Sequence, residues 1–213
     1  MVEIIVIEKF KNIRTGPLSN LVIGNIINEN NITFEINRRK YPNVKFIFDE
    51  IKLIDAEIKY VKISNDIRIN YDFLILSPGI GYKDYLIEGF DLLNKDIIPH
   101  CWDGNSNIRD FKRKLDDLET NSTILISSPD YPYRCPPAPY ERASLIANYK
   151  KKIGKKVKIM IFDSKDSFTK KENFIKEWDL NYKDTIEWIP RNKGGRIVFY
   201  DHENNTIIND HGE

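Results

Sequence analysis

The chain has 213 residues, of which 41% are hydrophobic and 12% aromatic, so it can form one large domain or parts of two and is not expected to be disordered. Its 33 Lys and Arg residues nearly balance its 32 Asp and Glu residues, and the formal net charge of +1 argues against a nucleic-acid or anionic-membrane surface. No apolar stretch approaches the ~20 residues that cross a bilayer, so no membrane-spanning segment is predicted.

The first half of the chain predicts mainly β-strands. The run 2–7, which is apolar except for Glu3 and is followed by Glu8, is typical of a strand that is buried on both faces of a parallel sheet. A second apolar run, 72–76, predicts another buried strand, which Ser77-Pro78-Gly79 closes. The other expected elements here are a short turn or helix at 18–24, a strand at 44–48 followed by Asp49, and an antiparallel hairpin of 57–63 with 67–71.

The second half predicts both helices and strands. A helix is expected at 107–119, with Ser106 as its N-cap and one apolar face formed by Ile108, Phe111, Leu115 and Leu118. The lysine run 150–152 is interpreted as a solvated helix end. The other expected elements are a strand at 123–126, a loop at 127–139, a helix at 139–152, a strand at 157–162 followed by Asp163, a helix at 173–178, a strand at 185–189 and a hairpin through 196–208.

One pattern occurs twice: the runs that end in Glu8 and in Asp163 are both buried strands closed by a carboxylate. In a dinucleotide-binding fold, such an acid ends the second strand and accepts hydrogen bonds from ribose hydroxyls. The second copy is preceded by a strand and a helix, whereas the first copy is not. The predicted class is therefore α/β with two Rossmann-like folds, and the first is expected to lack its N-terminal glycine-rich strand, turn and helix.

The segment 127–142 stands where the second fold would place its phosphate loop. A phosphate loop needs glycines that let backbone N–H groups approach the anion, but this segment has none and carries four prolines after Asp130. It is therefore not expected to hold NAD in the usual way. Instead it presents Cys135 just before a helix, beside Arg134, and both features favour the thiolate as a nucleophile. An ordinary loop with a buried cysteine remains the alternative.

The sequence Arg-Cys-Pro-Pro-Ala-Pro-Tyr-Glu-Arg-Ala-Ser at 134–144 resembles the cysteine loop of the flavoprotein subunit of flavocytochrome c sulfide dehydrogenase. That family belongs to the FAD-dependent pyridine nucleotide-disulfide reductase superfamily, together with the sulfide:quinone oxidoreductases. The resemblance extends to about residue 200, and the other segments that share it are 18–24, 71–80, 99–102 and 186–190.

The resemblance implies a disulfide-reductase-type fold, with a partial FAD-binding domain at 1–98 and a second, NAD-like Rossmann domain at 99–213. It also implies that sulfide attacks a redox-active cysteine pair and that electrons pass through FAD to a c-type cytochrome subunit. Cys135 matches one redox cysteine, and the other lies in the C-terminal part of the family, so the chain is interpreted as a central fragment.

The cofactor residues are also implied by the resemblance. Glu8 matches the acid that holds the adenosine ribose, Ile51 falls where the backbone contacts adenine, and Trp102 falls near the flavin. The turn of Ser77, Pro78 and Gly79 matches one that passes close to the cofactor. Non-covalent FAD is favoured, because residues 13–17 contain neither cysteine nor histidine.

Two further functions remain open: a quinone-linked sulfide oxidoreductase and a non-catalytic remnant. The resemblance implies a periplasmic location, although the start of the chain carries no export signal. The two cysteines exclude a disulfide framework, and the three histidines lack metal-ligand spacing, so no metal site is predicted. Cys101 is interpreted as a buried structural cysteine, with a replacement redox partner as the alternative. Trp178 and Trp188 are interpreted as packing residues, Asp163 is expected to cap a turn, and His100 is interpreted as structural, with modulation of a flavin as the alternative. Tyr131 and Tyr133 are equally consistent with ordinary packing and with shielding of the sulfur or flavin from water.

Overall fold

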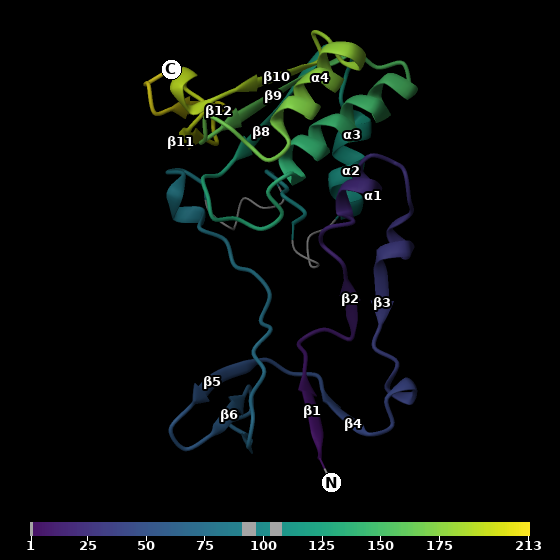
Figure 1. The fold of residues 1–213 in the computed structure, drawn as a ribbon, viewed down its shortest axis with the longest axis vertical. Helices are drawn as coiled ribbons and strands as arrows, with labels where there is room; N and C mark the ends of the chain where they lie inside the picture. The colour runs from purple at the N-terminus through teal and green to yellow at the C-terminus, as the bar shows by residue number, and fades with distance from the viewer. Residues whose placement is uncertain (1, 91–96, 103–107) are drawn as a thin grey trace. The chain divides into compact units, whose positions relative to one another are not determined.

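The computed structural model describes residues 2–90, 97–102 and 108–213 (Figure 1). The chain forms two compact units: unit 1 comprises Met1–Arg14 and Thr33–Gly79, and unit 2 comprises Thr15–Ile32 and Ile80–Glu213. The predicted domain division between residues 98 and 99 falls inside unit 2 and stays a prediction.

Unit 1 contains three small sheets. Strands β1 (Ile4–Ile7) and β4 (Val44–Ile47) pair in parallel, and β2 (Asn12–Arg14) pairs with β3 (Thr33–Glu35) in antiparallel fashion. The third sheet is an antiparallel meander of β5 (Ile51–Asp55), β6 (Tyr60–Ile63) and β7 (Arg68–Asn70). The β6–β7 hairpin confirms the predicted one, whereas the sequence did not predict the β2–β3 pair.

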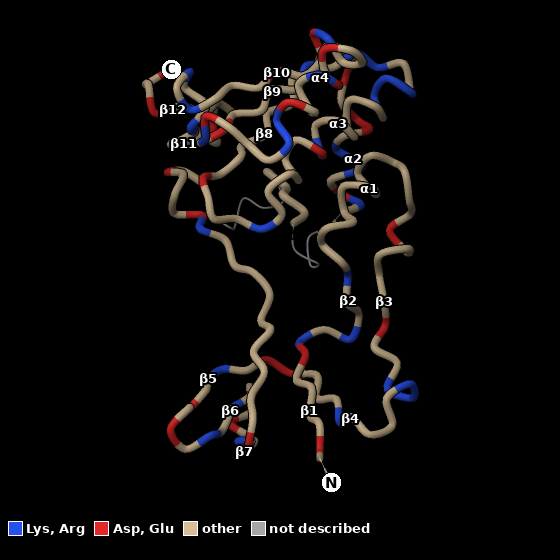
Figure 2. The backbone as a smooth tube through the Cα atoms, viewed as in Figure 1, with Lys and Arg blue, Asp and Glu red and all other residues tan. Residues whose placement is uncertain are grey.

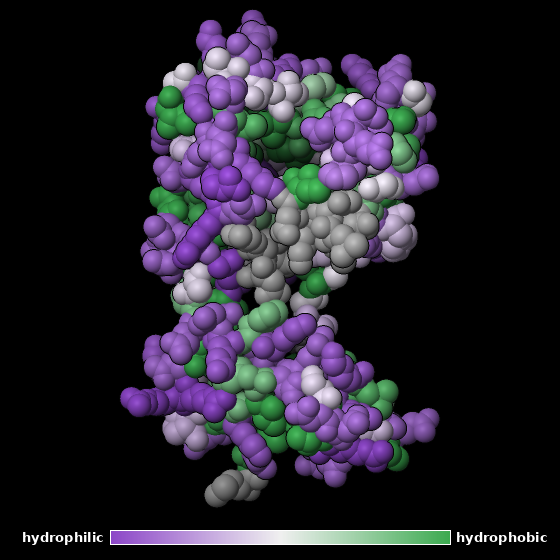
Figure 3. Space-filling model, turned by 180° about the vertical axis from the view of Figure 1, so that it is seen from behind, coloured by the Kyte–Doolittle hydropathy of each residue, from purple (hydrophilic) through white to green (hydrophobic). Residues whose placement is uncertain are grey.

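Two predicted buried strands of unit 1 are exposed. In β1, Ile4 is 49% exposed, because among the described residues β1 pairs with β4 alone. The run 72–76 forms no strand, and Phe73 and Ile75 are 94% and 90% exposed. Apolar (green) side chains are accordingly visible on the surface of Figure 3. The prediction of buried strands was wrong here, because an apolar run is buried only where other elements cover it.

Unit 2 is built on a parallel sheet of the order β10-β9-β8, formed by β8 (Ser122–Ser128), β9 (Val157–Asp163) and β10 (Ile186–Ile189). Helix α3 (Ala138–Lys152) connects β8 to β9, and α4 (Lys171–Asn181) connects β9 to β10. This β-α-β-α-β order confirms the predicted Rossmann-like fold, in which helices connect parallel strands.

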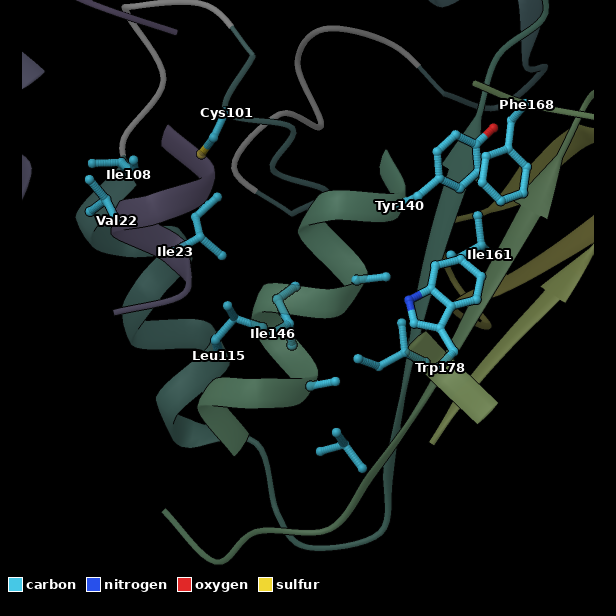
Figure 4. Packing of buried hydrophobic residues seen from close by; sticks show 14 of the residues in the cluster. Val22, Ile23, Cys101, Ile108, Leu115, Tyr140, Ile146, Ile161, Phe168 and Trp178 are labelled. Carbon is cyan, nitrogen blue, oxygen red and sulfur yellow. The ribbon is translucent and has the colours of Figure 1, made fainter. Parts of the chain in front are cut away.

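Helix α3 lies between the sheet and a pair of helices, α1 (Ser19–Ile23) and α2 (Ile108–Asp117) (Figure 4). On the sheet side, the Tyr140 ring stacks on Phe168 near Ile161 and Trp178. Figure 4 shows Val22, Ile23 and Cys101 on the other side of α3. Full burial of each large aliphatic side chain in this core contributes about 1.5–3 kcal/mol. The predicted packing role of Trp178 is confirmed.

Gly24 sets the approach of α1 to α3. A Cβ atom at residue 24 would lie 2.8 Å from the Leu145 Cβ atom, which is closer than real Cβ atoms come. Any larger residue would push α1 away from α3. This close packing matters for the cysteine loop, because Asn20 of α1 hydrogen-bonds to Ala138 at the start of α3.

The C-terminal part of unit 2 is an antiparallel hairpin of β11 (Ile197–Asp201) and β12 (Thr206–Asn209), as predicted. Short 3-10 turns occupy Glu29–Ile32, Arg38–Lys40, Asp84–Leu86 and Arg191–Lys193. Within the described residues, no helix is long and apolar enough to cross a membrane. The predicted N-cap Ser106 and the first helical residue, Asn107, lie outside the described residues.

The charged residues of both signs are interspersed along the chain (Figure 2), in agreement with its balanced composition. One lysine departs from the predicted solvated helix end: Lys150 is fully buried, and its Nζ donates a hydrogen bond to the Leu115 carbonyl. Burial lowers the pKa of Lys150. The solvated interpretation was wrong for this residue, because its face of α3 packs against α2.

Candidate functional site

The cysteine loop connects β8 to α3 and presents Cys135 two residues before the helix cap, Pro137. Prolines suit a helix start, where the N–H that they lack would have no partner within the helix. The carbonyl of Cys135 accepts a 2.9 Å hydrogen bond from the Ala138 N–H. Cys135 is a free, half-buried thiol whose backbone is left-handed, with a φ of 56°. This conformation is costly for a residue with a side chain, and such strain is concentrated at functional sites.

Cys135 lines a small pocket together with Gly16, Pro17, Trp102 and Arg134, all of which belong to unit 2. The structure therefore brings together two residues that the sequence had singled out separately, Cys135 and Trp102. Arg134 stands next in sequence to the thiol and supplies a cation there. A pocket of this small size with one sulfur, one indole and one cation suits a small anion.

Arg142, one turn into α3, ties the walls of this pocket together. Its Nε donates a 2.9 Å hydrogen bond to Asn20 Oδ1, and its Nη1 donates to the carbonyl of His100. The guanidinium carbon lies 3.5 Å from the centroid of the Trp102 ring. Burial lowers the pKa of Arg142 to about 10, so the side chain is still a cation at neutral pH. One buried cation thus fixes α1, the 100–102 segment and α3 relative to one another.

Asn20 completes the connection. Its Nδ2 donates to the Ala138 carbonyl at 3.2 Å and to Glu141 Oε2 at 2.8 Å, so that both ends of the first turn of α3 are held. Asn20 is buried, and it stands in α1, four residues after Gly16. The Gly16-Pro17 wall of the pocket is therefore anchored to the helix that follows Cys135.

Asp163, the fully buried acid at the end of β9, forms a hydrogen-bonded cluster near the cysteine loop. Asp163 Oδ1 lies 2.5 Å from Lys165 Nζ, while Asp163 Oδ2 accepts hydrogen bonds from Tyr140 Oη at 2.5 Å and from Trp188 Nε1 at 2.9 Å. Burial, followed by the hydrogen bond to Asp163, raises the pKa of Tyr140 far above the usual tyrosine range, so that its hydroxyl stays a donor.

Asp163 caps a turn, as predicted, because its Oδ1 also accepts a 3.1 Å hydrogen bond from the Lys165 N–H. Both carboxylate oxygens are engaged, so a ribose hydroxyl could bind Asp163 only by displacing an existing partner. The position that holds a ribose in a dinucleotide-binding fold is thus filled by the protein's own lysine, tyrosine and tryptophan.

In unit 1, Glu8 follows β1 and keeps part of its carboxylate available. Its Oε1 accepts a 3.0 Å hydrogen bond from the Phe10 N–H, and its Oε2 accepts no hydrogen bond from the described residues. Ile51 is the half-buried first residue of β5. Residues 77–79 are exposed, and Gly79 has a φ of 83°, where a Cβ atom would meet nothing from the described residues within 4 Å. A turn that lacks side-chain bulk allows close approach by a ligand.

The other predicted candidates have structural surroundings. His100 Nδ1 accepts a 3.3 Å hydrogen bond from the Trp102 N–H, and its ring centroid lies 4.1 Å from that of Tyr82. Cys101 is buried, and its carbonyl accepts a 2.8 Å hydrogen bond from Ser19 Oγ. Among the described residues, no group of His, Cys, Asp and Glu is placed to hold a metal ion.

The sequence did not single out Asn20, Arg142 or Lys165 as site residues. Arg142 and Asn20 both lie within the segments that carried the family resemblance, so this was a usable signal. Lys165 had no such signal. It stands two residues after the acid of β9, and a lysine in that position is usually solvated.

The fold of the chain is similar to that of several solved oxidoreductases. A sulfide:quinone oxidoreductase from Aquifex aeolicus has a similar structure, with a TM-score of 0.73 and 16% identity over 99% of this chain and 49% of that one. A ferredoxin reductase from Rhodopseudomonas palustris has a TM-score of 0.63 and 15% identity, over 99% of this chain and 49% of that one. NDH2 from Plasmodium falciparum, solved in complex with NADH, has a TM-score of 0.62 and 16% identity, over 93% of this chain and 44% of that one.

Residues 109–213 match the family described as the central region of the sulfide dehydrogenase (flavocytochrome c) flavoprotein chain. The matched range contains Cys135, Arg142, Asp163 and Lys165, and it confirms the resemblance that the cysteine loop suggested. The chain spans about half the length of the solved structures to which it is similar, 49% in the first two cases.

Proposed function

We propose that this chain is the central part of an FAD-dependent sulfide dehydrogenase flavoprotein that oxidises sulfide through Cys135. The observation that carries the proposal is the free thiol of Cys135, held in a left-handed conformation at a pocket that it shares with Trp102. The match of residues 109–213 to a flavoprotein chain supports it.

The residues present fit an FAD. Glu8 follows a parallel strand and has one carboxylate oxygen without a hydrogen bond to the described residues, as an acceptor for ribose hydroxyls requires. Ile51 and the turn Ser77-Pro78-Gly79 would supply backbone contacts in unit 1, and Trp102 would contact the flavin in unit 2. When bound, FAD supplies a two-electron acceptor.

The proposed step is thiol–disulfide chemistry. Hydrosulfide attacks a sulfur of a disulfide that includes Cys135, a new S–S bond forms to the attacked cysteine, and the other cysteine leaves as a thiolate that carries the electron pair. The neighbouring cation of Arg134 favours the approach of this anion. The family resemblance supplies the second cysteine from the C-terminal part of the flavoprotein.

The decisive experiment replaces Cys135 by serine in the full-length, flavin-loaded flavoprotein, which includes the C-terminal part with the second cysteine. C135S should abolish flavin reduction by sulfide, read as bleaching of the flavin absorbance, while leaving the bound flavin content unchanged. Cys101→Ser is the matched control and should retain sulfide-dependent reduction. Wild-type turnover in C135S would refute the role of Cys135.

The electron acceptor is part of the same proposal. The matched flavoprotein chain is described as that of a flavocytochrome c, which supports a c-type cytochrome partner. A periplasmic location is part of the proposal. The similarity to a sulfide:quinone oxidoreductase supports quinone as the alternative. Parallel assays with cytochrome c and with a soluble quinone would separate the two, because the correct acceptor should sustain multiple turnovers.

A further inference from the structure

Lys165 is buried directly behind the cysteine loop, with its side chain only 5% exposed. Its ammonium donates to Asp163 Oδ1 at 2.5 Å, to Ser128 Oγ at 3.0 Å and to the Pro129 carbonyl at 2.6 Å. These three bonds use all three donors of an ammonium group. The lysine thus joins the end of β9 to the end of β8 and to the first residue of the cysteine loop.

Two tyrosines of the loop close over the same ammonium. The ring centroids of Tyr131 and Tyr133 lie 5.4 Å apart, and Lys165 Nζ lies 5.3 Å and 4.8 Å from them, within the range of cation–π attraction. Tyr133 Oη in turn donates a 2.7 Å hydrogen bond to the carbonyl of Pro136, the residue after Cys135. A continuous series of contacts therefore runs from Lys165 through Tyr133 to the backbone beside the thiol.

The loop has few backbone hydrogen bonds to hold it. Within 130–135, the carbonyl of Cys135 makes the one backbone–backbone hydrogen bond found among the described residues. Pro132, Pro136 and Pro137 have no N–H to donate. The left-handed backbone of Cys135 is a conformation that persists only where the surroundings impose it.

We propose that Lys165 is the positioning residue of the Cys135 thiol, acting through Tyr133 and the Pro136 carbonyl; its catalytic meaning rests on the proposed function. A buried ion pair gives little net stability when compared with apolar side chains of similar size, so stability alone does not account for the Asp163–Lys165 pair. Lys165 lies where a dinucleotide-binding fold holds its nucleotide, and in this protein it positions the Cys135 sulfur instead.

The test compares the reactivity of two thiols in one protein. Asp163→Asn with Lys165→Met removes both buried charges together, because Lys165→Met alone would leave Asp163 unpaired and endanger folding. Tyr133→Phe keeps the ring and removes the hydroxyl, and with it the hydrogen bond to Pro136 and the contacts with Ser128 and Tyr140. Tyr131→Phe is the matched control, since the Tyr131 hydroxyl makes no hydrogen bond with the described residues. Alkylation by iodoacetamide is followed separately at Cys135 and Cys101 by peptide mass spectrometry.

Release of the loop should expose the half-buried thiol. In Y133F and in the double variant, alkylation of Cys135 should accelerate about fivefold, which corresponds to about 1 kcal/mol, while Cys101 stays as protected as in the wild type. Y131F should react at the wild-type rate. In the flavin-loaded protein, the sulfide-dependent kcat should fall in the same two variants, because a mobile sulfur loses its attack geometry.

These results separate the two proposals. Faster alkylation confined to Cys135 would support the positioning role even if the wild-type protein failed to oxidise sulfide, and that failure would count against the proposed function alone. Wild-type alkylation of Cys135 in Y133F, or equal acceleration at Cys101 and Cys135 in the double variant, would overturn the positioning role.

Discussion

The guanidinium carbon of Arg142 lies 3.5 Å from the centroid of the Trp102 ring. The same guanidinium donates hydrogen bonds to Asn20 Oδ1 and to the carbonyl of His100. Its Nη2 is buried and has no hydrogen-bond partner among the described residues. A cation in this environment is costly to bury, and its contacts with three segments around the Cys135 pocket offset that cost.

Replacement of Arg142 by methionine should therefore loosen unit 2. The buried Asn20 Oδ1 and the half-buried His100 carbonyl would each lose a donor, and the loss of such hydrogen bonds to a charged group costs about 1–3 kcal/mol. Urea unfolding followed by circular dichroism measures the loss. Arg134→Met, at the other arginine of the same pocket, is the control and should stay within about 0.5 kcal/mol of the wild type. An equal loss in the two variants would contradict the role given to Arg142.

Gly24→Ala should destabilise the packing of α1 on α3. The added Cβ would meet the Leu145 Cβ at 2.8 Å, and overpacking of this kind costs about 1–3 kcal/mol. Gly81→Ala is the control, because no atom of the described residues lies within 4 Å of a Cβ at that position. The second change Leu145→Ala should recover part of the loss in G24A, and a double variant no more stable than the sum of the single losses would argue against a direct clash.

The alkaline stability should depend on Tyr140. Its pKa is raised in the folded state by burial and by the bond to Asp163, so above pH ~10, the ordinary tyrosine pKa, the unfolded chain releases a proton that the folded chain keeps. The free energy of unfolding therefore falls as pH rises, by about 1.4 kcal/mol per pH unit from this residue. Tyr140→Phe should reduce that slope when unfolding is measured between pH ~9 and pH ~11, whatever its effect at neutral pH. An unchanged slope would contradict the assignment.

Phe73 and Ile75 should contribute to self-association and not to the stability of this chain, because both are at least nine-tenths exposed. Phe73→Ser with Ile75→Ser should leave the free energy of unfolding within about 0.5 kcal/mol of the wild type. Sedimentation velocity should show less association in the variant. Ile63→Ser, at a buried position of β6, is the contrasting control and should lower stability by more than about 2 kcal/mol. Comparable losses in the two would show that residues 72–76 pack in solution.

The sequence predicted those elements whose own pattern determines them. The apolar runs around Ile124 and Ile159 predicted β8 and β9, and the apolar face of 108–118 predicted α2, because periodicity is a local property. The exposure of Phe73 was not predictable in this way, since burial depends on which elements cover a strand. The β2–β3 pair was missed because three-residue strands carry too few residues for a pattern.

The residues of the site also fall into those that local sequence predicts and those that depend on distant partners. Cys135 could be found from its proline-rich surroundings, which are contiguous in sequence. Arg142 and Lys165 acquire their roles from partners such as Asn20, 122 residues away, and Ser128, 37 residues away. A buried cation has no sequence signature of its own, because the same residue type is solvated in most proteins.

The Asp163–Lys165 pair has a consequence for anyone wishing to redesign unit 2 to use a nicotinamide coenzyme. Grafting a glycine-rich turn in place of residues 129–137 would not suffice, because Asp163, the acid that would bind the ribose, would still be paired with Lys165. Lys165 would have to be replaced at the same time, and Tyr140 and Trp188 would have to release the second oxygen. A change of coenzyme therefore requires several simultaneous substitutions, and no single one of them would give a gain that selection or screening could detect.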